Sequence, residues 1–434
     1  MDLYQSFSSV IEEYLAPCSR IVLAFSGGID SRVLLSLLAR YQQETHRPTL
    51  AVHVHHGLSV NADEWANQCQ EWAAQSDVPF ILEKVQLDAS GKSIEECARD
   101  ERYKVLARHV KERDILLTGQ HGDDQLETFL LALKRGSGPK GLSAMAESKP
   151  FSNGRLVRPL LKVRREEIEQ YAQHYGLNWV EDESNQDSRF DRNYIRHHIS
   201  PVIDARWPHF AQSVQRSAQL CAEQELLLDE LLQDKLRLLV NSDGSLAIQG
   251  MADLSALMRA RLIRMWLANS GQRMPSRDHL DKIWHQVALA KADANPVLNL
   301  TSAQVRRFNR CLHLVSTHDD ISDWSQRLGL GEELELPDRL GHLTLQATST
   351  GSLSLSALQQ APLRIIFNPE GLSAHPAERG HSRKLKKLFQ EYQVPSWERR
   401  RRPILMCGDK VAAIADLFID HHFIGQDCEL IWSK

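Results

Sequence analysis

The chain has 434 residues, of which 42% are apolar and 25% charged, and its formal net charge is −4. This length is too great for one ordinary core, so we expect two or three domains of a soluble globular protein. No apolar run approaches the ~20 residues that span a bilayer, and the acidic, amphipathic first twenty residues do not have the pattern of a signal peptide. We therefore expect a cytoplasmic protein.

The seven cysteines include no C-x-x-C pair. This spacing argues against a structural zinc site and against a dithiol redox motif, and the odd number favours free, buried thiols.

The first 185 residues alternate between short β-branched segments and helical patterns. This alternation predicts an α/β fold with a parallel sheet covered by helices on both faces. Ser93 and Glu96 form a capping-box pattern at one helix start. The expected strands are 21–25, 50–54, 80–85, 115–118 and 178–180, and the expected helices are 31–41, 62–75, 93–108, 123–134 and 164–175.

The remainder of the chain has two patterns. From 207 to 291 leucines recur at three- and four-residue spacing, and a mixed stretch follows to about 318, where the polar "THDDISDW" predicts a linker. After it we expect a small α+β unit with strands near 343–347, 363–367 and 411–414. The predicted domains are a catalytic domain over 1–206, a mainly helical middle domain over 207–318 and a C-terminal domain over 319–434.

The segment "FSGGIDS", residues 25–31, joins the first expected strand to the first expected helix. Unpaired N–H groups and the positive end of a helix dipole meet at such a turn, which makes it an anion site. Gly27 and Gly28 let the backbone close around phosphate oxygens, Ser26 and Ser31 add hydroxyl groups, and Asp30 can hold Mg²⁺ or cap the helix. No Walker lysine is present. The alternative is a simple strand–turn–helix corner.

S-G-G-I-D-S resembles the pyrophosphate-binding loop of the N-type ATP pyrophosphatases, the PP-loop superfamily. Further stretches, together with this loop, are similar to the tRNA(Ile)-lysidine synthase family. They are "VHVHHGLS" (52–59), "ERY" (101–103), "TGQHGDDQLET" (118–128), "KRGSGPKGLSAM" (134–145), "RPLL" (158–161) and "EDESNQDSRFDRNYIRHHISP" (181–201). "RKLKKLFQEYQVPSWERRRRPIL" (383–405) resembles that family's distal tRNA-binding motif.

The resemblance implies a reaction. ATP adenylylates the C2 oxygen of the wobble cytidine in the CAU anticodon of an isoleucine tRNA, and the ε-amine of free lysine then displaces AMP. The products are lysidine, AMP and PPi, and codon reading switches from AUG to AUA. The implied fold of the N-terminal part is adenine nucleotide alpha hydrolase-like. The implied cofactors are ATP and Mg²⁺, the partners are tRNA and L-lysine, and no membrane or stable protein partner is expected.

Site residues follow from the matched motifs and their positions. An amine with a pKa near 10.4 is neutral in only about one molecule in a few thousand at pH 7, so carboxylates near the loop suit binding or deprotonation of lysine. They also suit a helix dipole, and a metal site formed by His53, His55, His56 and His121 is not expected. The expected catalytic residues are Asp30, Arg102, Asp123, Asp124 and Glu127. The expected ATP-binding residues are Ser26, Gly27, Gly28, Ile29, Asp30, Ser31, His53, His55 and His121, with Asp30 and Asp124 as Mg²⁺ ligands.

The expected RNA contacts lie in three basic stretches. The segment 383–402 has Leu385, Leu388, Phe389 and Tyr392 at helical spacing, which predicts an amphipathic helix with basic residues on its other face. Four arginines follow a proline turn there, a pattern more typical of phosphate contacts than of a solvated face. The expected tRNA-binding residues are Lys134, Arg135, Arg192, Asn193, Arg196, Lys384, Lys386, Lys387, Arg399, Arg400 and Arg401.

Two other functions stay open at this point. A tRNA thiolase would use the same adenylylation with a different nucleophile, but such enzymes typically relay sulfur through paired cysteines, which this chain lacks. A non-catalytic tRNA-binding protein with an inactive nucleotide loop is the second, and the intact loop and carboxylate cluster argue against it.

Overall fold

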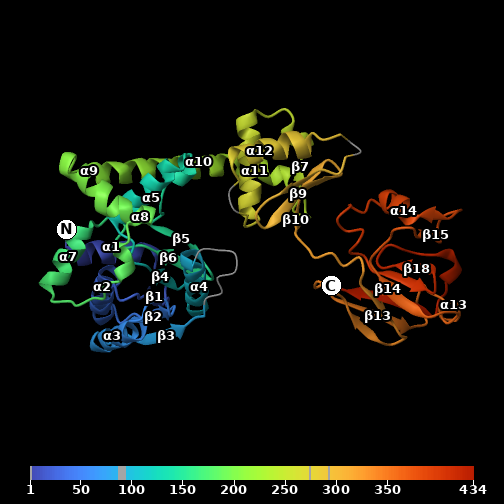
Figure 1. The fold of residues 1–434 in the computed structure, drawn as a ribbon, viewed down its shortest axis with the longest axis horizontal. Helices are drawn as coiled ribbons and strands as arrows, with labels where there is room; N and C mark the ends of the chain where they lie inside the picture. The colour runs from blue at the N-terminus through green and yellow to red at the C-terminus, as the bar shows by residue number, and fades with distance from the viewer. Residues whose placement is uncertain (1, 87–93, 273–274, 292–293) are drawn as a thin grey trace. The chain divides into compact units, whose positions relative to one another are not determined.

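The computed structural model describes residues 2–86, 94–272, 275–291 and 294–434. The chain divides into two compact units, Met1–Asp229 and Glu230–Lys434 (Figure 1). Each unit has its own hydrophobic cores. Within the described residues, no helix is both long enough and apolar enough to cross a membrane.

The first unit contains a six-stranded sheet in the order β3-β2-β1-β4-β6-β5. All neighbouring strands are parallel except the β5–β6 pair, which is antiparallel. The strands are β1 (Ile21–Ala24), β2 (Thr49–His55), β3 (Phe80–Lys84), β4 (Ile115–Leu117), β5 (Ser148–Phe151) and β6 (Gly154–Val157).

Four of the five expected strands are confirmed, but the strand expected at 178–180 is wrong. That segment has no strand assignment, although the Val180 N–H donates to the Gly27 carbonyl oxygen at 3.0 Å. The parallel position beside β4 is taken by β6 instead. A single backbone hydrogen bond to a glycine turn does not extend a sheet ladder.

Helices cover both faces of this sheet, as predicted, because side chains of a strand alternate between faces. Ile21 and Leu23 of β1 belong to one buried cluster with side chains of α1, α2 and α7, whereas Val22 clusters with Leu106 of α4. The helices are α1 (Leu3–Tyr14), α2 (Ile29–Thr45), α3 (Ala62–Gln75), α4 (Ile94–His109), α5 (Gly122–Lys134) and α7 (Arg165–His174). The expected helices are confirmed; Ser93 lies outside the described residues, and so does the capping box that includes it.

Short helical segments follow α7 and lead into the longest helix of the chain, which crosses the boundary between the two units (Figure 1). These elements are η1 (Glu183–Gln186), α8 (Asp191–Tyr194), η2 (Ile195–Ile199), α9 (Ser200–Arg206) and α10 (Phe210–Leu239), and a further short helix, α6 (Pro139–Leu142), lies between α5 and β5. The helical pattern expected from residue 207 is therefore confirmed.

The second unit begins with helices packed on a small antiparallel sheet in the order β7-β10-β9-β8. The expected helices are present, and the sheet accounts for the mixed stretch that ends near residue 318. The elements are β7 (Leu246–Ala247), η3 (Gln249–Met251), α11 (Ala256–Asn269), α12 (Arg277–Lys282), η4 (Ile283–Ala288), β8 (Val297–Asn299), β9 (Ala303–Phe308) and β10 (Cys311–Ser316).

The C-terminal part is richer in strands than in helices. Its sheets have the orders β11-β14-β17-β18-β19, β12-β13-β20 and β15-β16. The strands are β11 (Ser325–Arg327), β12 (Glu333–Glu335), β13 (His342–Ala347), β14 (Leu363–Ile366), β15 (Ser373–Ala374), β16 (Arg383–Lys384), β17 (Ile404–Cys407), β18 (Lys410–Ile414), β19 (Phe418–Ile419) and β20 (Cys428–Ser433). The helices are α13 (Leu355–Leu358), α14 (Leu385–Glu391) and η5 (His421–Phe423).

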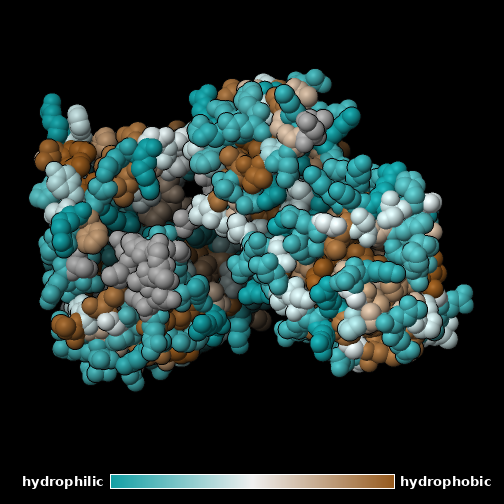
Figure 2. All heavy atoms as spheres, turned by 45° about the vertical axis from the view of Figure 1, so that its right-hand side comes forward, coloured by the Kyte–Doolittle hydropathy of each residue, from teal (hydrophilic) through white to brown (hydrophobic). Residues whose placement is uncertain are grey.

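The three strands expected in this part are confirmed, and so is the amphipathic helix, because Leu385, Leu388 and Phe389 of α14 are buried. On the face of the chain shown in Figure 2, hydrophilic residues predominate and hydrophobic residues occur in small groups.

Candidate functional site

Two helix N-termini meet at one edge of the sheet in the first unit. Strands β1 and β4 are parallel neighbours, so α2 and α5 both start at the carboxyl edge, where ligands bind in open α/β sheets. Asp30 in the first turn of α2 and Asp124 in the first turn of α5 lie 3.8 and 3.6 Å from Nε2 of His121. Segments far apart in the sequence therefore form one site.

The glycine turn is held by its own serine hydroxyls. The Gly27 N–H donates to Ser31 Oγ at 3.0 Å, and Ser31 Oγ donates to the Gly28 carbonyl at 2.9 Å. Gly27 has φ +87°, and a Cβ there would lie 2.8 Å from Cys69 Sγ. Ser26 Oγ lies 3.1 Å from Ser31 Oγ, and Ile29 is buried at the start of α2. The turn therefore requires glycine at position 27 and places the N-terminus of α2 toward the carboxyl edge of the sheet.

Arg165, at the start of α7, links two of the expected catalytic carboxylates. Its Nη1 lies 2.9 and 3.1 Å from the two Asp30 oxygens, and its backbone N–H donates to Asp123 at 2.7 Å. Burial raises the pKa of Asp30, an effect that His121 and Arg165 partly offset. Burial would also raise the pKa of Asp123, but its hydrogen bonds with His121 and Arg165 hold that pKa below its usual value.

Asp124 and Glu127 are buried against two arginines. Arg192 Nε and Arg196 Nε each donate to Glu127 at 2.7 Å, and the Nη2 groups of both arginines lie within 3.2 Å of Asp124 Oδ1. Glu127 is only 1% exposed. Arg192 and Arg196 thus pair with Asp124 and Glu127. The spacing of the two arginines predicts that they form one basic edge, but it does not predict this pairing.

His121 is the N-terminal cap of α5 and stands among three carboxylates. Its Nδ1 lies 3.5 Å from Asp123, and its Nε2 faces Asp30 and Asp124. Burial alone would lower the pKa of His121, but the three carboxylates outweigh burial and raise this pKa. The imidazole is therefore a proton-holding group at the centre of the site.

The remaining expected histidines lie at the end of β2. His53 Nδ1 lies 2.9 Å from the Phe25 carbonyl, and His55 Nε2 lies 3.3 Å from Asp63. Arg102 Nε donates to His56 Nε2 at 3.3 Å, and burial together with this arginine lowers the pKa of His56 to about 4. Burial likewise lowers the pKa of Arg102. His56 is therefore a neutral hydrogen-bonding group at neutral pH.

The other expected RNA contacts of the first unit lie near the end of α5 and in α8. Lys134 Nζ pairs with Asp191 at 2.7 Å, Arg135 Nε donates to the Leu131 carbonyl at 3.1 Å, and Asn193 Nδ2 donates to the Asp187 carbonyl at 3.1 Å. The lysine pair is more than half exposed on both sides and is therefore available to a competing phosphate.

The expected RNA contacts of the second unit lie on and after α14. Lys384, Lys386 and Lys387 are exposed. Arg401 pairs with Asp338 at 2.7 Å and is 15% exposed, whereas Arg400 pairs with Glu370 and is 47% exposed. Arg399 Nε donates to the Val394 carbonyl at 3.0 Å. The lysines and Arg400 are the most accessible cations of this group.

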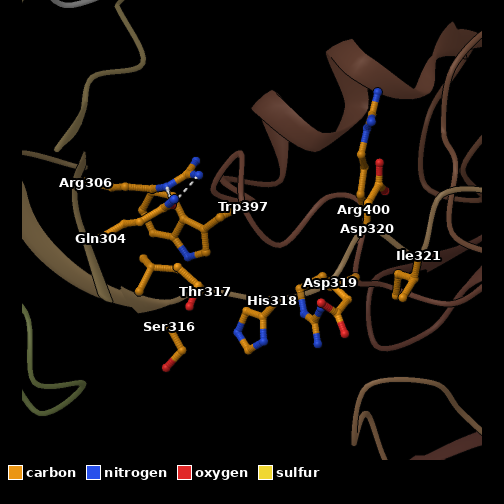
Figure 3. Close-up of a pocket in the computed structure, with 12 residues that line it drawn as sticks. Gln304, Arg306, Ser316, Thr317, His318, Asp319, Asp320, Ile321, Trp397 and Arg400 are labelled. Carbon is orange, nitrogen blue, oxygen red and sulfur yellow. Dashed lines mark hydrogen bonds between the residues drawn. The ribbon is translucent and has the colours of Figure 1, made fainter. Parts of the chain in front are cut away.

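A pocket in the second unit adds an aromatic surface beside these arginines (Figure 3). Arg306 donates to Gln304, and its guanidinium carbon lies 5.8 Å from the centre of the Trp397 ring. Arg400, Arg401 and His318 also line the pocket. A half-buried arginine beside an aromatic ring is suited to a stacked base and its phosphate.

Comparisons with known proteins agree with this arrangement. Family models match as a PP-loop domain over residues 2–203, a TilS substrate binding domain over 246–313 and a TilS substrate C-terminal domain over 363–433. The chain is 59% identical over 434 residues to the "tRNA(Ile)-lysidine synthase" of Vibrio vulnificus (strain YJ016), covering 100% of this chain and 99% of the relative. It is 46% identical to the protein of that name from Photobacterium profundum, covering 99% of each.

Among solved structures, the U34-tRNA thiolase NcsA from Methanococcus maripaludis aligns at a TM-score of 0.44 with 17% identity, covering 51% of this chain and 78% of that chain. This alignment is too weak to carry an argument.

Sequence reasoning missed Arg165, which joins Asp30 to Asp123. Its position in the sequence predicts only the start of a helix, and its partner Asp30 is distant along the chain. A signal was nevertheless present, because Arg165 lies shortly after the matched "RPLL" motif (158–161).

Proposed function

Because this chain belongs to the tRNA(Ile)-lysidine synthase family, we propose that it joins free lysine to C2 of the wobble cytidine in the CAU anticodon of an isoleucine tRNA. It is an ATP-dependent, tRNA-modifying ligase of the PP-loop superfamily. The observation that carries the residue-level proposal is the meeting of the glycine turn with the buried carboxylates of α5 at one edge of the sheet. We place the reaction in the cytoplasm.

The glycine turn binds the pyrophosphate part of ATP. Gly27 shapes the turn, while Ser26, Gly28, Ile29 and Ser31 present backbone N–H groups, two hydroxyl oxygens and the N-terminus of α2 to the phosphates. His53, His55 and His121 lie along the same edge. The position of Arg102 beside His56 supports a role in stabilising the adenylate. Pyrophosphate is the leaving group, so a lysine that holds only a γ-phosphate is not required.

Asp30 and Asp124 have the oxygen donors that Mg²⁺ prefers, and both carboxylates face His121 Nε2. The raised pKa of buried Asp30 means that a cation beside it would stabilise the ionised carboxylate. These residues therefore fit the metal, and we assign them to it. When bound, Mg²⁺ would neutralise part of the phosphate charge.

Asp123, Asp124 and Glu127 bind the incoming lysine and take the proton that its ε-ammonium must lose. Arg192 and Arg196 orient Asp124 and Glu127, because each arginine donates to both carboxylates. The outer N–H groups of these arginines, with Lys134, Arg135 and Asn193, contact the anticodon arm of the tRNA. Binding of RNA phosphate would then compete with the carboxylates for the two arginines.

The basic residues of the second unit contact other parts of the tRNA. Lys384, Lys386, Lys387, Arg399, Arg400 and Arg401 supply phosphate contacts, and Trp397 with Arg306 supplies a stacking surface. An initiator tRNA carries the same CAU anticodon, so contacts outside the anticodon must discriminate between the two. We divide the chain into 1–206, 207–318 and 319–434 for these roles, and one family model falls in each part.

Incorporation of labelled lysine into tRNA tests this proposal. We expect label in an isoleucine transcript with a CAU anticodon, only with ATP, and none in the same transcript with a GAU anticodon. Asp30→Asn should lose incorporation, whereas Asp234→Asn, which changes an exposed pair with Arg237 in α10, should keep it. Equal labelling of both transcripts, or an active Asp30→Asn variant, would contradict the proposal.

A further inference from the structure

We propose that Asp420, His421 and His422, in the second unit, form a binding site for a divalent transition-metal ion of the Zn²⁺ type. Strand β19 ends at Ile419, and the short helix η5 begins at His421. Among the described residues, these three are the group whose ligand atoms all lie within 4.8 Å of one another. None of these three residues belongs to the nucleotide turn or to the basic residues assigned to RNA.

The distances between the donor atoms match those around a single ion. Asp420 Oδ1 lies 3.0 Å from His422 Nδ1 and 3.5 Å from His421 Nδ1. Bonds from Zn²⁺ to nitrogen or oxygen are about 2.0–2.1 Å, so adjacent ligands in a tetrahedral site stand about 3.4 Å apart. The two distances from Asp420 are therefore close to the spacing of ligands that share one ion, and the ligand atoms of all three residues lie within 4.8 Å of one another.

The nitrogen of His421 lacks any other partner. Its Nδ1 is buried and makes no hydrogen bond within the described structure. A proton shared between His422 Nδ1 and Asp420 Oδ1 accounts for the pair at 3.0 Å, but it leaves His421 Nδ1 beside the same carboxylate oxygen at a longer distance. An ion bonded to all three atoms would satisfy this nitrogen, whose burial otherwise costs free energy.

Hydrogen bonds with the surrounding backbone orient Asp420 and His421, as hydrogen bonds to ligands do around known metal sites. Asp420 is only 6% exposed, and its second oxygen, Oδ2, accepts the His375 N–H at 2.6 Å. The His421 N–H donates to the His375 carbonyl at 2.8 Å. These bonds leave Oδ1 of Asp420 turned toward the imidazoles.

Access from solvent is also present, since the side chains of His421 and His422 are 36% and 62% exposed. An ion can therefore enter, and water can fill a fourth position. The ligand set of two imidazoles and one carboxylate suits Zn²⁺ and its neighbours better than Mg²⁺ or Ca²⁺.

Helix capping explains only part of the arrangement. Asp420 Oδ1 accepts the His422 N–H at 3.1 Å, which is an ordinary cap at the start of η5. Such a cap does not need two imidazoles with their Nδ1 atoms turned to the same oxygen. The metal site accounts for both histidines and keeps the cap, because a carboxylate oxygen has more than one lone pair.

Calorimetric titration of the tag-free, chelator-treated full chain with Zn²⁺ tests the site. We expect one ion per chain, with binding at least tenfold weaker in His421→Ala and in His422→Ala. His342→Ala is the matched control, because His342 is a half-exposed histidine 4.0 Å from a carboxylate in the same unit, and it should leave binding unchanged. No binding to the wild-type chain, or equal binding by all variants, would overturn the proposal.

X-ray absorption of the zinc-loaded wild-type chain gives a second test that does not depend on how the variants fold. The proposal predicts two imidazole nitrogens with oxygen ligands and no sulfur. A sulfur ligand would overturn it, because the ion would then lie at a cysteine such as the exposed Cys18.

Discussion

Glu127 accepts hydrogen bonds from both Arg192 and Arg196, and each arginine also reaches Asp124. Glu127 is almost fully buried in α5, and the arginines come from α8 and η2, far along the sequence. This cluster fixes the segment after residue 190 against two carboxylates of α5. The contacts that hold this segment in place therefore also orient the carboxylates that we propose to bind lysine.

Replacing Glu127 with alanine should destabilise the first unit. The change leaves two arginines without their main partner, and removal of one side of a buried pair costs about 3–5 kcal/mol; because both arginines are about one-third exposed, we expect about 2 kcal/mol. Urea unfolding measures this loss. Glu169→Ala removes an exposed partner of Arg165 and should cost less than about 1 kcal/mol. Equal losses in the two variants would show that the pairing of Glu127 with two arginines stabilises the fold no more than an exposed ion pair does.

Gly27→Ala should impair both folding and ATP binding. The residue has φ +87°, and the new Cβ would meet Cys69 Sγ at 2.8 Å, so we expect a loss of roughly 2–3 kcal/mol and a raised KM for ATP. Gly176→Ala is the control, because it has φ +59° with no atom within 4 Å of the added Cβ and tests backbone strain alone. Its loss should be about 1 kcal/mol with an unchanged KM. A Gly27→Ala chain with normal KM would contradict the assignment of the turn.

His121 should make the stability of the first unit dependent on pH. Its pKa is raised above the usual value of 6.5, so the folded chain holds the proton more tightly than the unfolded chain. The resulting stability is present below pH 6.5 and is lost as the pH rises through the raised pKa. His121→Asn keeps a capping side chain without this titration. The free energy of unfolding of the wild type should fall relative to the variant above pH 6.5, whereas parallel pH curves would contradict the raised pKa.

Arg400→Ala should weaken tRNA binding about three- to tenfold at ~0.1 M salt and reduce the salt dependence of the dissociation constant by about one phosphate contact. Arg400 is 47% exposed and pairs with Glu370 on the surface, so the change should leave the fold intact. Arg364→Ala is the control, since Arg364 is equally exposed and pairs with Asp409 in the same unit. Filter binding across salt concentrations measures both. The same loss in both variants would mean that only net charge matters.

Much of the first unit could be predicted from local pattern. Strands β1 to β4 are short apolar runs bounded by polar residues, and helical spacing identifies the helices between them. The hairpin of β5 and β6 was missed although "SNG" at its turn is a hairpin signal, because Pro150 interrupts the first strand. Residues 178–180 have strand-like composition, but β6 already fills the position beside β4, which only tertiary packing decides.

One part of the candidate site could likewise be predicted from the sequence pattern, and another part could not. The glycine turn and the carboxylates of α5 are adjacent in sequence to strand ends, so their meeting follows from the parallel sheet. The pairing of Asp30 with Arg165 joins residues far apart in the chain, so the motif before Arg165 does not identify Asp30 as its partner. Arg192 and Arg196 share one helix face as their spacing predicts, but the face they contact is the carboxylate pair, which spacing alone cannot identify.

The most direct test of the central claim is AMP release from ATP by the full chain, with and without lysine, in the presence of isoleucine tRNA with a CAU anticodon. The account predicts that sustained AMP release needs both lysine and tRNA and is lost in Asp30→Asn. Turnover that is independent of lysine would contradict the assignment of lysine as the nucleophile, and turnover without tRNA would contradict adenylylation of the cytidine.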